Sequence, residues 1–144
     1  MQEDFLRFLP EEEYGVSKNH DFPKDIQEEL DYLDEALNEY ERFIMNIGNL
    51  GVSAVMLMYY RDEVQESMDY LKTKDLDIAE YWKKIIQLDN ILRSKTRIFV
   101  SEVGYNSFKQ YQIINDPPKL RWWWYLDKGI PAPLAPGQIW EIWK

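Results

Sequence analysis

Few residues of this 144-residue chain have the types and spacing that catalytic or metal chemistry needs. His20 is the only histidine, and it stands beside Asp21. A Ser–His–Asp site needs a histidine held in position as a base, and a di-metal helical bundle needs Glu-x-x-His pairs on two helices. The absence of cysteine excludes thiolate ligands and a cysteine nucleophile. We therefore predict no catalytic residue, no metal site and no cofactor.

The sequence RWWWY at residues 121–125 is the strongest candidate for a binding function. In a helix, successive residues point 100° apart, so three consecutive tryptophans cover about 200° of the helix circumference. The segment could fold back over the chain's own core, or it could present aromatic surface to a partner. Residues predicted to contact a partner are Arg121, Trp122, Trp123, Tyr125, Ile139, Trp140, Ile142 and Trp143.

The last four of these residues follow a proline-rich stretch. Three prolines lie within residues 131–136, and such sequences are extended and stiff. An extended segment that ends in IWEIW can dock in a groove or add to a sheet edge of another protein. Whether it packs on its own chain or on a partner stays open at this level.

Hydrophobic periodicity predicts a first helix at about 23–46. Asp21 could cap this helix, or Pro23 could occupy its first turn. A heptad-like spacing supports the helix, and its members are Ile26, Leu30, Leu33, Leu37, Tyr40, Ile44 and Ile47.

Two further long helices are predicted at about 51–72 and 76–102. Asp75 is the expected N-cap of the second of these, and Gly104 is its expected end. The first half of the helix at 51–72 is apolar on most sides, which indicates that the C-terminal segment or another subunit covers it. Short connections favour an antiparallel, up-down-up bundle.

Shorter elements are predicted after Gly104. One helix begins near Asn106 or Ser107. Another spans about 117–127, with Asp116 as its cap and Pro117 in its first turn, and it stops at Gly129. A strand is the alternative for 117–127, because tryptophan and tyrosine favour strands.

The predicted fold class is all-α: an antiparallel three-helix (up-down-up) bundle with short C-terminal helices and an extended Pro/Trp-rich tail. It comprises an acidic arm at 1–22, the bundle at 23–104 and an aromatic C-terminal segment at 105–144, within one domain.

Charge and composition narrow the function classes. Residues 1–80 hold 7 Lys and Arg against 21 Asp and Glu, whereas residues 81–144 hold 10 against 5. The net charge of −9 argues against non-specific nucleic-acid binding. We see no secretory signal and no apolar run near the ~20 residues of a membrane span. A cytoplasmic protein is therefore expected.

These observations favour a non-enzymatic protein–protein interaction module, such as an assembly factor, adaptor or chaperone-like regulator. Its partner would be another protein of unknown identity, and a homodimer is possible because a heptad seam suits a bundle or a dimer equally. Two alternatives remain open: a bundle that binds a small molecule or pigment in an aromatic pocket, and an enzyme that uses helix carboxylates.

Overall fold

The computed structural model describes residues 25–129, and this part of the chain contains helices and turns but no strand. The all-α prediction is therefore confirmed for these residues. The predicted arm at 1–22 and the tail at 130–144 lie outside the described residues. The helices are α1 (Ile26–Met45), η2 (Gly51–Ser53), α2 (Met56–Lys72), α3 (Ala79–Ser94), α4 (Thr96–Val103), α5 (Tyr105–Asn115) and η3 (Trp122–Lys128), where η denotes a 3₁₀ helix.

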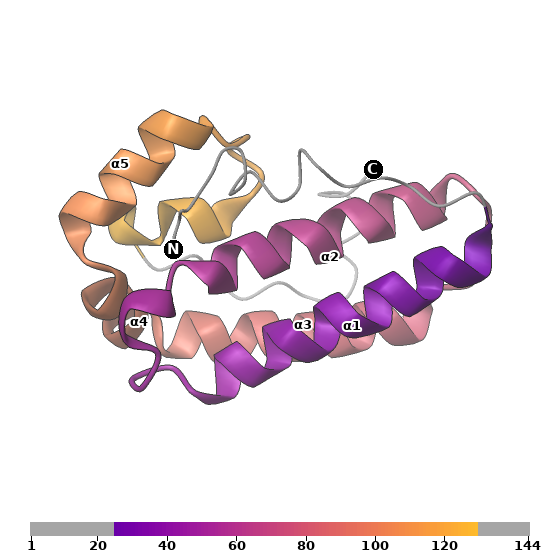
Figure 1. The fold of residues 1–144 in the computed structure, drawn as a ribbon, viewed down its shortest axis with the longest axis horizontal. Helices are drawn as coiled ribbons and strands as arrows, with labels where there is room; N and C mark the ends of the chain where they lie inside the picture. The colour runs from indigo at the N-terminus through magenta and orange to yellow at the C-terminus, as the bar shows by residue number, and fades with distance from the viewer. Residues whose placement is uncertain (1–24, 130–144) are drawn as a thin grey trace.

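The three longest helices lie side by side along the long axis of the molecule, and α4, α5 and η3 gather at one end (Figure 1). Helix α1 packs most extensively against α2 and also contacts α3. Four of the α1 residues predicted from their spacing are buried, namely Leu33, Leu37, Tyr40 and Ile44. The largest fully buried aliphatic and aromatic side chains include Leu33, Tyr40, Ile44, Leu57, Met58, Met68, Phe99, Phe108, Trp123 and Trp124.

Helix α1 begins slightly later than predicted. Asp25, rather than Asp21, occupies the N-cap position, and its carboxylate accepts the backbone N–H of Glu28 at 2.8 Å. This bond satisfies one of the four N–H groups that a helix start leaves without a partner. The helix therefore starts at Ile26.

The start of the third long helix also differs from the prediction. Asp75 has a positive φ of 58° and belongs to the turn after α2, so the prediction that it is an N-cap is wrong. Asp77 lies closer to the helix start, and its side chain accepts the N–H of Ala79 at 3.1 Å. The left-handed region tolerates Asp because its short side chain bonds locally.

The helix predicted at 76–102 is divided into α3 and α4 at Lys95, whose φ and ψ are −112° and 19°. The hydroxyl of Thr96 donates to the carbonyl oxygens of Leu92 at 3.3 Å and Arg93 at 2.8 Å. A hydroxyl that bonds back to the preceding turn competes with the backbone ladder and bends helices. Hydrophobic periodicity continues across this break, which explains why a single helix was predicted.

Helix α4 ends at Gly104 as predicted, with a φ of 95° that glycine adopts without a steric penalty. Asp116, predicted to start the next helix, instead ends α5 in the left-handed conformation, and its N–H donates to Gln112 at 2.9 Å. Pro117 and Pro118 then separate α5 from η3, because proline cannot continue a helix. The helix predicted at 117–127 therefore starts later and is a 3₁₀ helix, not a strand.

Candidate functional site

The RWWWY segment is anchored on one carboxylate of α2. Trp123 and Trp124 are both 0% exposed. Their indole N–H groups donate to Oδ1 of Asp62 at 2.8 and 2.9 Å. Arg121 pairs with the same oxygen at 3.2 Å. Two buried indoles and a guanidinium thus converge on a single side chain.

Burial dominates the electrostatics of this anchor and raises the pKa of Asp62 above its ordinary value. The charge of Arg121 and the two indole hydrogen bonds oppose that rise, because each favours the ionised form. The residue is only 5% exposed, so it does not offer a carboxylate to solvent. Asp62 is therefore a structural anchor.

A second buried network joins α1, α2 and α3. The guanidinium of Arg61 donates from Nε and one terminal nitrogen to the two oxygens of Asp89, both at 3.0 Å. The Tyr40 hydroxyl donates a hydrogen bond to Asp89 at 2.6 Å. The other terminal nitrogen of Arg61 donates a hydrogen bond to the side-chain oxygen of Gln65 at 3.1 Å. Arg61 also lies 4.2 Å from the ring centroid of Trp123. The network is closed to solvent and holds the aromatic segment against three helices.

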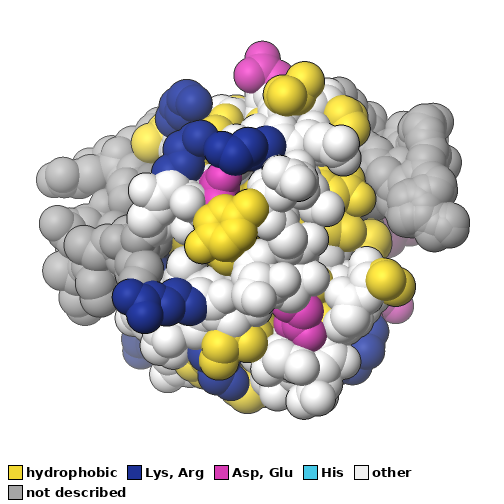
Figure 2. Space-filling view, turned by 90° about the vertical axis from the view of Figure 1, so that its left-hand side faces the viewer, with side chains coloured by type: hydrophobic (Ala, Val, Ile, Leu, Met, Phe, Trp, Pro, Cys, Tyr) yellow, Lys and Arg dark blue, Asp and Glu magenta, His cyan; other side chains and the backbone are white. Residues whose placement is uncertain are grey.

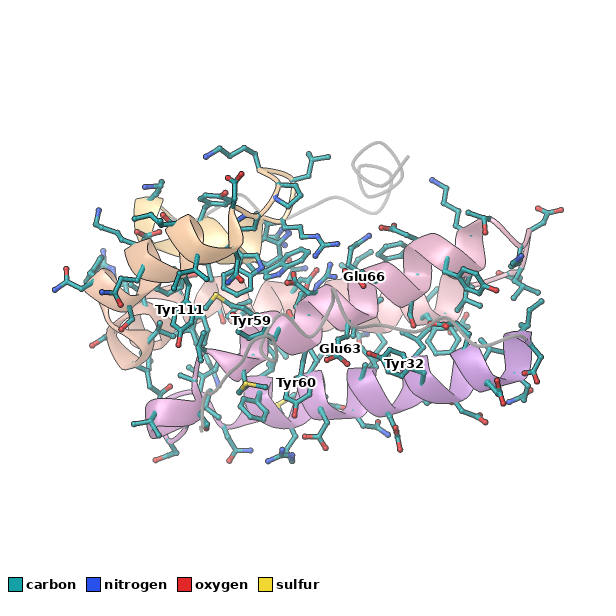
Figure 3. All side chains as sticks on the ribbon, turned by 45° about the horizontal axis from the view of Figure 1, so that its top comes forward. Tyr32, Tyr59, Tyr60, Glu63, Glu66 and Tyr111 are labelled. Atoms are coloured by element: carbon teal, nitrogen blue, oxygen red, sulfur yellow. The ribbon has the colours of Figure 1, made fainter. Side chains whose placement is uncertain are left out.

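A hollow of about 350 Å³ opens between α1 and α2, and we call it the acidic groove. Tyr32 of α1 donates its hydroxyl to Glu63 of α2 at 2.7 Å across the helix contact. Figure 3 shows these two residues and Tyr60 between the two helices. The polar and aromatic side chains that line the groove are Tyr32, Glu35, Asn38, Glu39, Tyr60 and Glu63.

The carboxyl group of Glu63 in this groove has a raised pKa. Burial, together with the charges of Asp62 and Glu66, raises its pKa to about 7, and the hydrogen bond from Tyr32 opposes the rise. Burial likewise raises the pKa of Tyr60, with a further contribution from the charge of Glu39 and then of Glu63. A carboxyl group that titrates near neutral pH in a hollow is typical of functional sites, although structural clusters also produce it.

This titration predicts a pH-dependent stability. The folded pKa of about 7 exceeds the ordinary value of 4.5, so the native state binds more protons between these limits. The free energy of unfolding should therefore fall by up to about 3 kcal/mol as pH rises from about 4.5 to above 7. Urea unfolding of the wild type and of Glu63→Gln across this range measures the change.

In the Glu63→Gln variant, the free energy of unfolding should lose most of its dependence on pH. The control Glu80→Gln replaces an exposed carboxylate of α3 and should keep the pH dependence of the wild type. Equal slopes in Glu63→Gln and the wild type would show that other groups cause the pH dependence.

A different feature, an exposed apolar surface, lies at the end of the molecule formed by α4, α5 and the turn after α1. Figure 2 shows hydrophobic side chains on this end with Lys and Arg side chains among them. We call it the end surface. Within the described residues, all exposed large hydrophobic side chains lie outside α2 and α3; they are Met45, Val52, Ile98, Tyr105, Ile113, Ile114 and Leu120.

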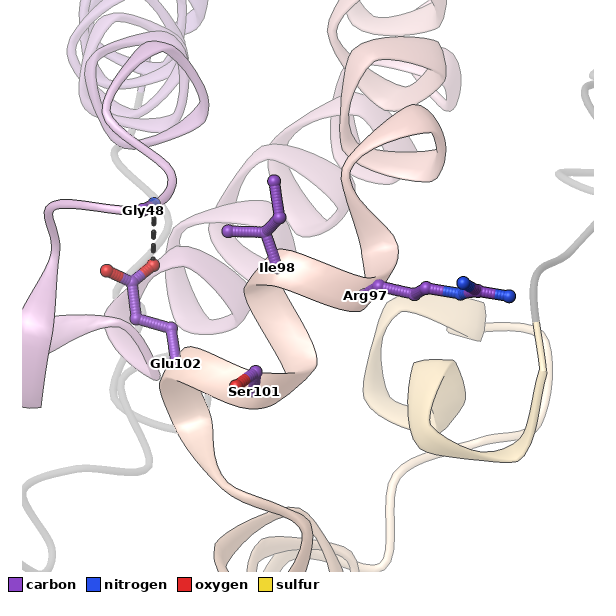
Figure 4. Close-up of a pocket in the computed structure, with 5 residues that line it drawn as sticks. All are labelled: Gly48, Arg97, Ile98, Ser101 and Glu102. Carbon is purple, nitrogen blue, oxygen red and sulfur yellow. Dashed lines mark hydrogen bonds between the residues drawn. The ribbon is translucent and has the colours of Figure 1, made fainter.

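The end surface contains a second hollow, of about 430 Å³, between α4 and the turn after α1 (Figure 4). The carboxylate of Glu102 accepts the backbone N–H groups of Gly48 at 2.9 Å, Leu50 at 2.6 Å and Gly51 at 3.2 Å. These bonds hold the turn on α4. Arg97 also borders this hollow, and its side chain extends away from Glu102 (Figure 4).

The structure separates the predicted partner-binding residues into groups. Trp123 lies in the core, and Arg121 is held by Asp62 and is 19% exposed at its side chain. Trp122 and Tyr125 are partly buried, each beneath a cation: Arg93 lies 4.0 Å from the Trp122 ring centroid, and a lysine covers Tyr125. The other predicted residues, which are Ile139, Trp140, Ile142 and Trp143, lie outside the described residues.

Sequence reasoning missed Asp62, Arg61 and Glu63, although a signal was present. The first half of the helix at 51–72 was interpreted as apolar on most sides, and these three charged residues follow it directly. Charged residues that continue a buried stretch need partners when they are buried too. It also missed Ile113 and Ile114. Residue type gave no signal for these two positions, because neighbouring apolar residues of one helix can both be buried, as Phe99 and Val100 of α4 are.

Among residues 25–129, no three His, Cys, Asp or Glu side chains are grouped so that they could hold a metal ion. No helix in this range has the length and apolar character to cross a membrane. Comparison with protein-family models, curated proteins and solved structures finds no match for this chain. A functional hypothesis therefore rests on the surfaces described above.

Proposed function

We propose that this protein is a non-enzymatic interaction module that binds an acidic, apolar segment of another protein on the end surface. The observation that carries the proposal is the collection of exposed apolar side chains at one end of the described chain. Ile113 is 80% exposed, Ile114 is 69% exposed and Tyr105 is 60% exposed. Large exposed apolar patches mark interaction surfaces more often than unused surface.

Charge supports an acidic partner. Residues 95–129 contain six Lys and Arg against three Asp and Glu. Two of these acids are engaged within the chain, since Glu102 binds the turn and Asp127 accepts the side-chain amide of Gln112 at 2.8 Å. The end surface is therefore basic around its apolar residues, and complementary charge on a partner would speed association and fix orientation.

The platform for this surface would be an up-down-up bundle of α1, α2 and α3, with the aromatic segment as its brace. Short connections between these helices support that arrangement. Trp123 and Trp124 would pack on the bundle and stabilise it, and Trp122 and Tyr125 would add to the surface that contacts the partner. The tail residues predicted to join it are Ile139, Trp140, Ile142 and Trp143.

A displayed library of random helical peptides tests the proposal with the full-length chain as bait. The enriched peptides should carry apolar residues at helical spacing together with Asp and Glu. The Ile113→Asp/Ile114→Asp variant should bind them at least ~10-fold more weakly, because it replaces two apolar contacts with two charges that repel the peptide. Both positions are exposed, so the fold should be retained.

The matched control places two aspartates on α3 instead, as Lys83→Asp/Gln87→Asp, and should bind the peptides nearly as well as the wild type. Peptides that bind the Ile113→Asp/Ile114→Asp variant with unchanged affinity would refute the end surface as the docking site. The mass in solution, measured by light scattering, shows whether a second copy is the partner. A dimer that the same variant dissociates would replace the heterologous partner with the acidic half of another copy.

A further inference from the structure

The acidic groove carries a separate inference, because its lining combines negative charge with aromatic surface. Among residues 25–129, the charged residues that line it are all carboxylates, namely Glu35, Glu39 and Glu63. Tyr32 and Tyr60 supply the rings. A hollow of about 350 Å³ is within the lower range of small-ligand pockets.

Glu63 is the buried carboxylate of this groove. It is 8% exposed and makes no ion pair with any described residue. Its Oε1 accepts the Tyr32 hydroxyl at 2.7 Å, and its second oxygen accepts no hydrogen bond from the part of the chain that the structure describes. Burying a carboxylate is costly unless it is paired, so the second oxygen is suited to a donor that carries positive charge.

The groups around Glu63 make a positively charged donor more favourable at its second oxygen. Helix α1 presents Tyr32, Glu35 and Glu39; helix α2 presents Tyr60, Asp62 and Glu66; and Arg121 lies directly before η3. Arg121 pairs with Asp62 and, at 3.6 Å, with Glu66. Arg42 pairs with Glu39 at the outer rim. Arg121 and Arg42, the cations that the described part of the chain brings near the groove, are thus paired with carboxylates other than Glu63.

The aromatic walls favour one class of cation. Tyrosine ring faces attract an ammonium group electrostatically, and carboxylates at the same site add charge-assisted hydrogen bonds. The raised pKa values of Tyr60 and Glu63 are consistent with a negative and partly desolvated hollow. A bare metal ion would find no preorganised set of three ligands among residues 25–129.

We propose that the acidic groove binds an organic ammonium group, with Glu63 as its counter-ion and the rings of Tyr32 and Tyr60 as its walls. The ammonium group can belong to a free alkylamine or to the lysine side chain of a peptide, because both present the same chemistry to the groove. This site lies between α1 and α2 and is independent of the end surface.

Calorimetric titration of the full-length chain tests this site with defined probes. The probes are n-butylammonium, the neutral analogue 1-butanol, and a blocked Gly-Lys-Gly tripeptide. We expect ammonium binding at about pH 8 and about tenfold weaker binding at about pH 6, because protonation of a carboxyl group with a pKa near 7 competes with the ligand. Weaker binding to 1-butanol by at least ~10-fold would show that the charge is recognised.

Two substitutions and a matched control complete the test. Glu63→Gln should weaken ammonium binding at about pH 8 by at least ~10-fold and remove its pH dependence, whereas Glu80→Gln on α3 should change neither. Glu35 lies at the exposed rim of the groove, so Glu35→Gln should leave the fold intact. This variant should weaken ammonium binding about twofold to threefold. Binding only by n-butylammonium would identify a free amine as the ligand, and binding only by the tripeptide would identify a protein side chain.

Either of these results supports the site. No binding of either ammonium probe at about pH 8, or equal binding to the wild type and Glu63→Gln, would overturn it. Because the end surface is not involved, the outcome leaves the peptide-library test of the proposed function unaffected.

Discussion

Replacement of Asp62 by alanine should lower the free energy of unfolding by about 3–5 kcal/mol. The substitution leaves the indole N–H groups of Trp123 and Trp124 buried without an acceptor, and each such group costs about 1–3 kcal/mol. It also removes one carboxylate partner of Arg121. The loss should exceed that of an ordinary surface substitution several-fold.

Urea unfolding followed by tryptophan fluorescence and by helical circular dichroism measures this effect. Asp62→Asn should lose less than Asp62→Ala, because the amide oxygen can still accept an indole hydrogen bond. The matched control Asp31→Ala removes an exposed carboxylate of α1 and should change the free energy of unfolding by no more than about 0.5 kcal/mol. A loss below about 1 kcal/mol in Asp62→Ala would contradict the anchor role.

The second large effect is expected at Arg61. Arg61→Met should lower the free energy of unfolding by about 3–5 kcal/mol, because it leaves the Asp89 carboxylate buried without its cation. The side chains of this ion pair are both 0% exposed, so water cannot replace the lost contacts in the native fold. Tyr40 and Gln65 also lose part of their network.

The double variant Arg61→Met/Asp89→Leu separates the cost of an unpaired charge from the value of the pair. Replacing a whole buried ion pair by apolar residues is often neutral or stabilising, so the double variant should be more stable than Arg61→Met alone. Arg42→Met breaks an exposed ion pair with Glu39 and should change stability by less than about 1 kcal/mol. A double variant that loses the sum of the two single losses would show that the two side chains act independently.

Both substitutions act on the same part of the molecule. Arg61 and Asp62 are neighbours on α2, and between them they hold Trp123, Trp124 and the Asp89 carboxylate. Natural domains have only about 5–15 kcal/mol of stability in total. Either substitution would therefore remove a large share of the total stability. We infer that the main structural role of the aromatic segment is to pack on Arg61 and Asp62 of α2.

Local sequence signals predicted the helices better than their ends. The heptad spacing of Leu33, Leu37 and Ile44 correctly placed the buried face of α1, because a helix repeats its orientation every 3.6 residues. Asp75 and Asp116 were predicted to be helix caps, yet both adopt a positive φ after a helix end. Aspartate is common at helix starts and also tolerated in the left-handed region, so residue type alone does not distinguish these uses.

The candidate sites were less predictable than the fold. Composition and the RWWWY sequence drew attention to aromatic contact, but they did not indicate that Trp123 and Trp124 would share one acceptor on α2. Nor did they indicate that Tyr32 and Glu63, 31 residues apart, would meet across a hollow. Long-range pairs of this kind depend on how two helix faces are rotated against each other, which hydrophobic spacing specifies only coarsely.

The sequence by itself determined that this chain folds through helices, where their apolar faces lie, and that chemistry based on cysteine is excluded. Those properties follow from residue type and from spacing along one helix. Only the tertiary structure decided which charges are buried, which tryptophans remain near the surface, and where exposed isoleucines collect. These depend on the three-dimensional packing of α2 against α1 and η3, and of α5 against α4 and η3, because a side chain's partners are set by distance in space and not by separation along the chain.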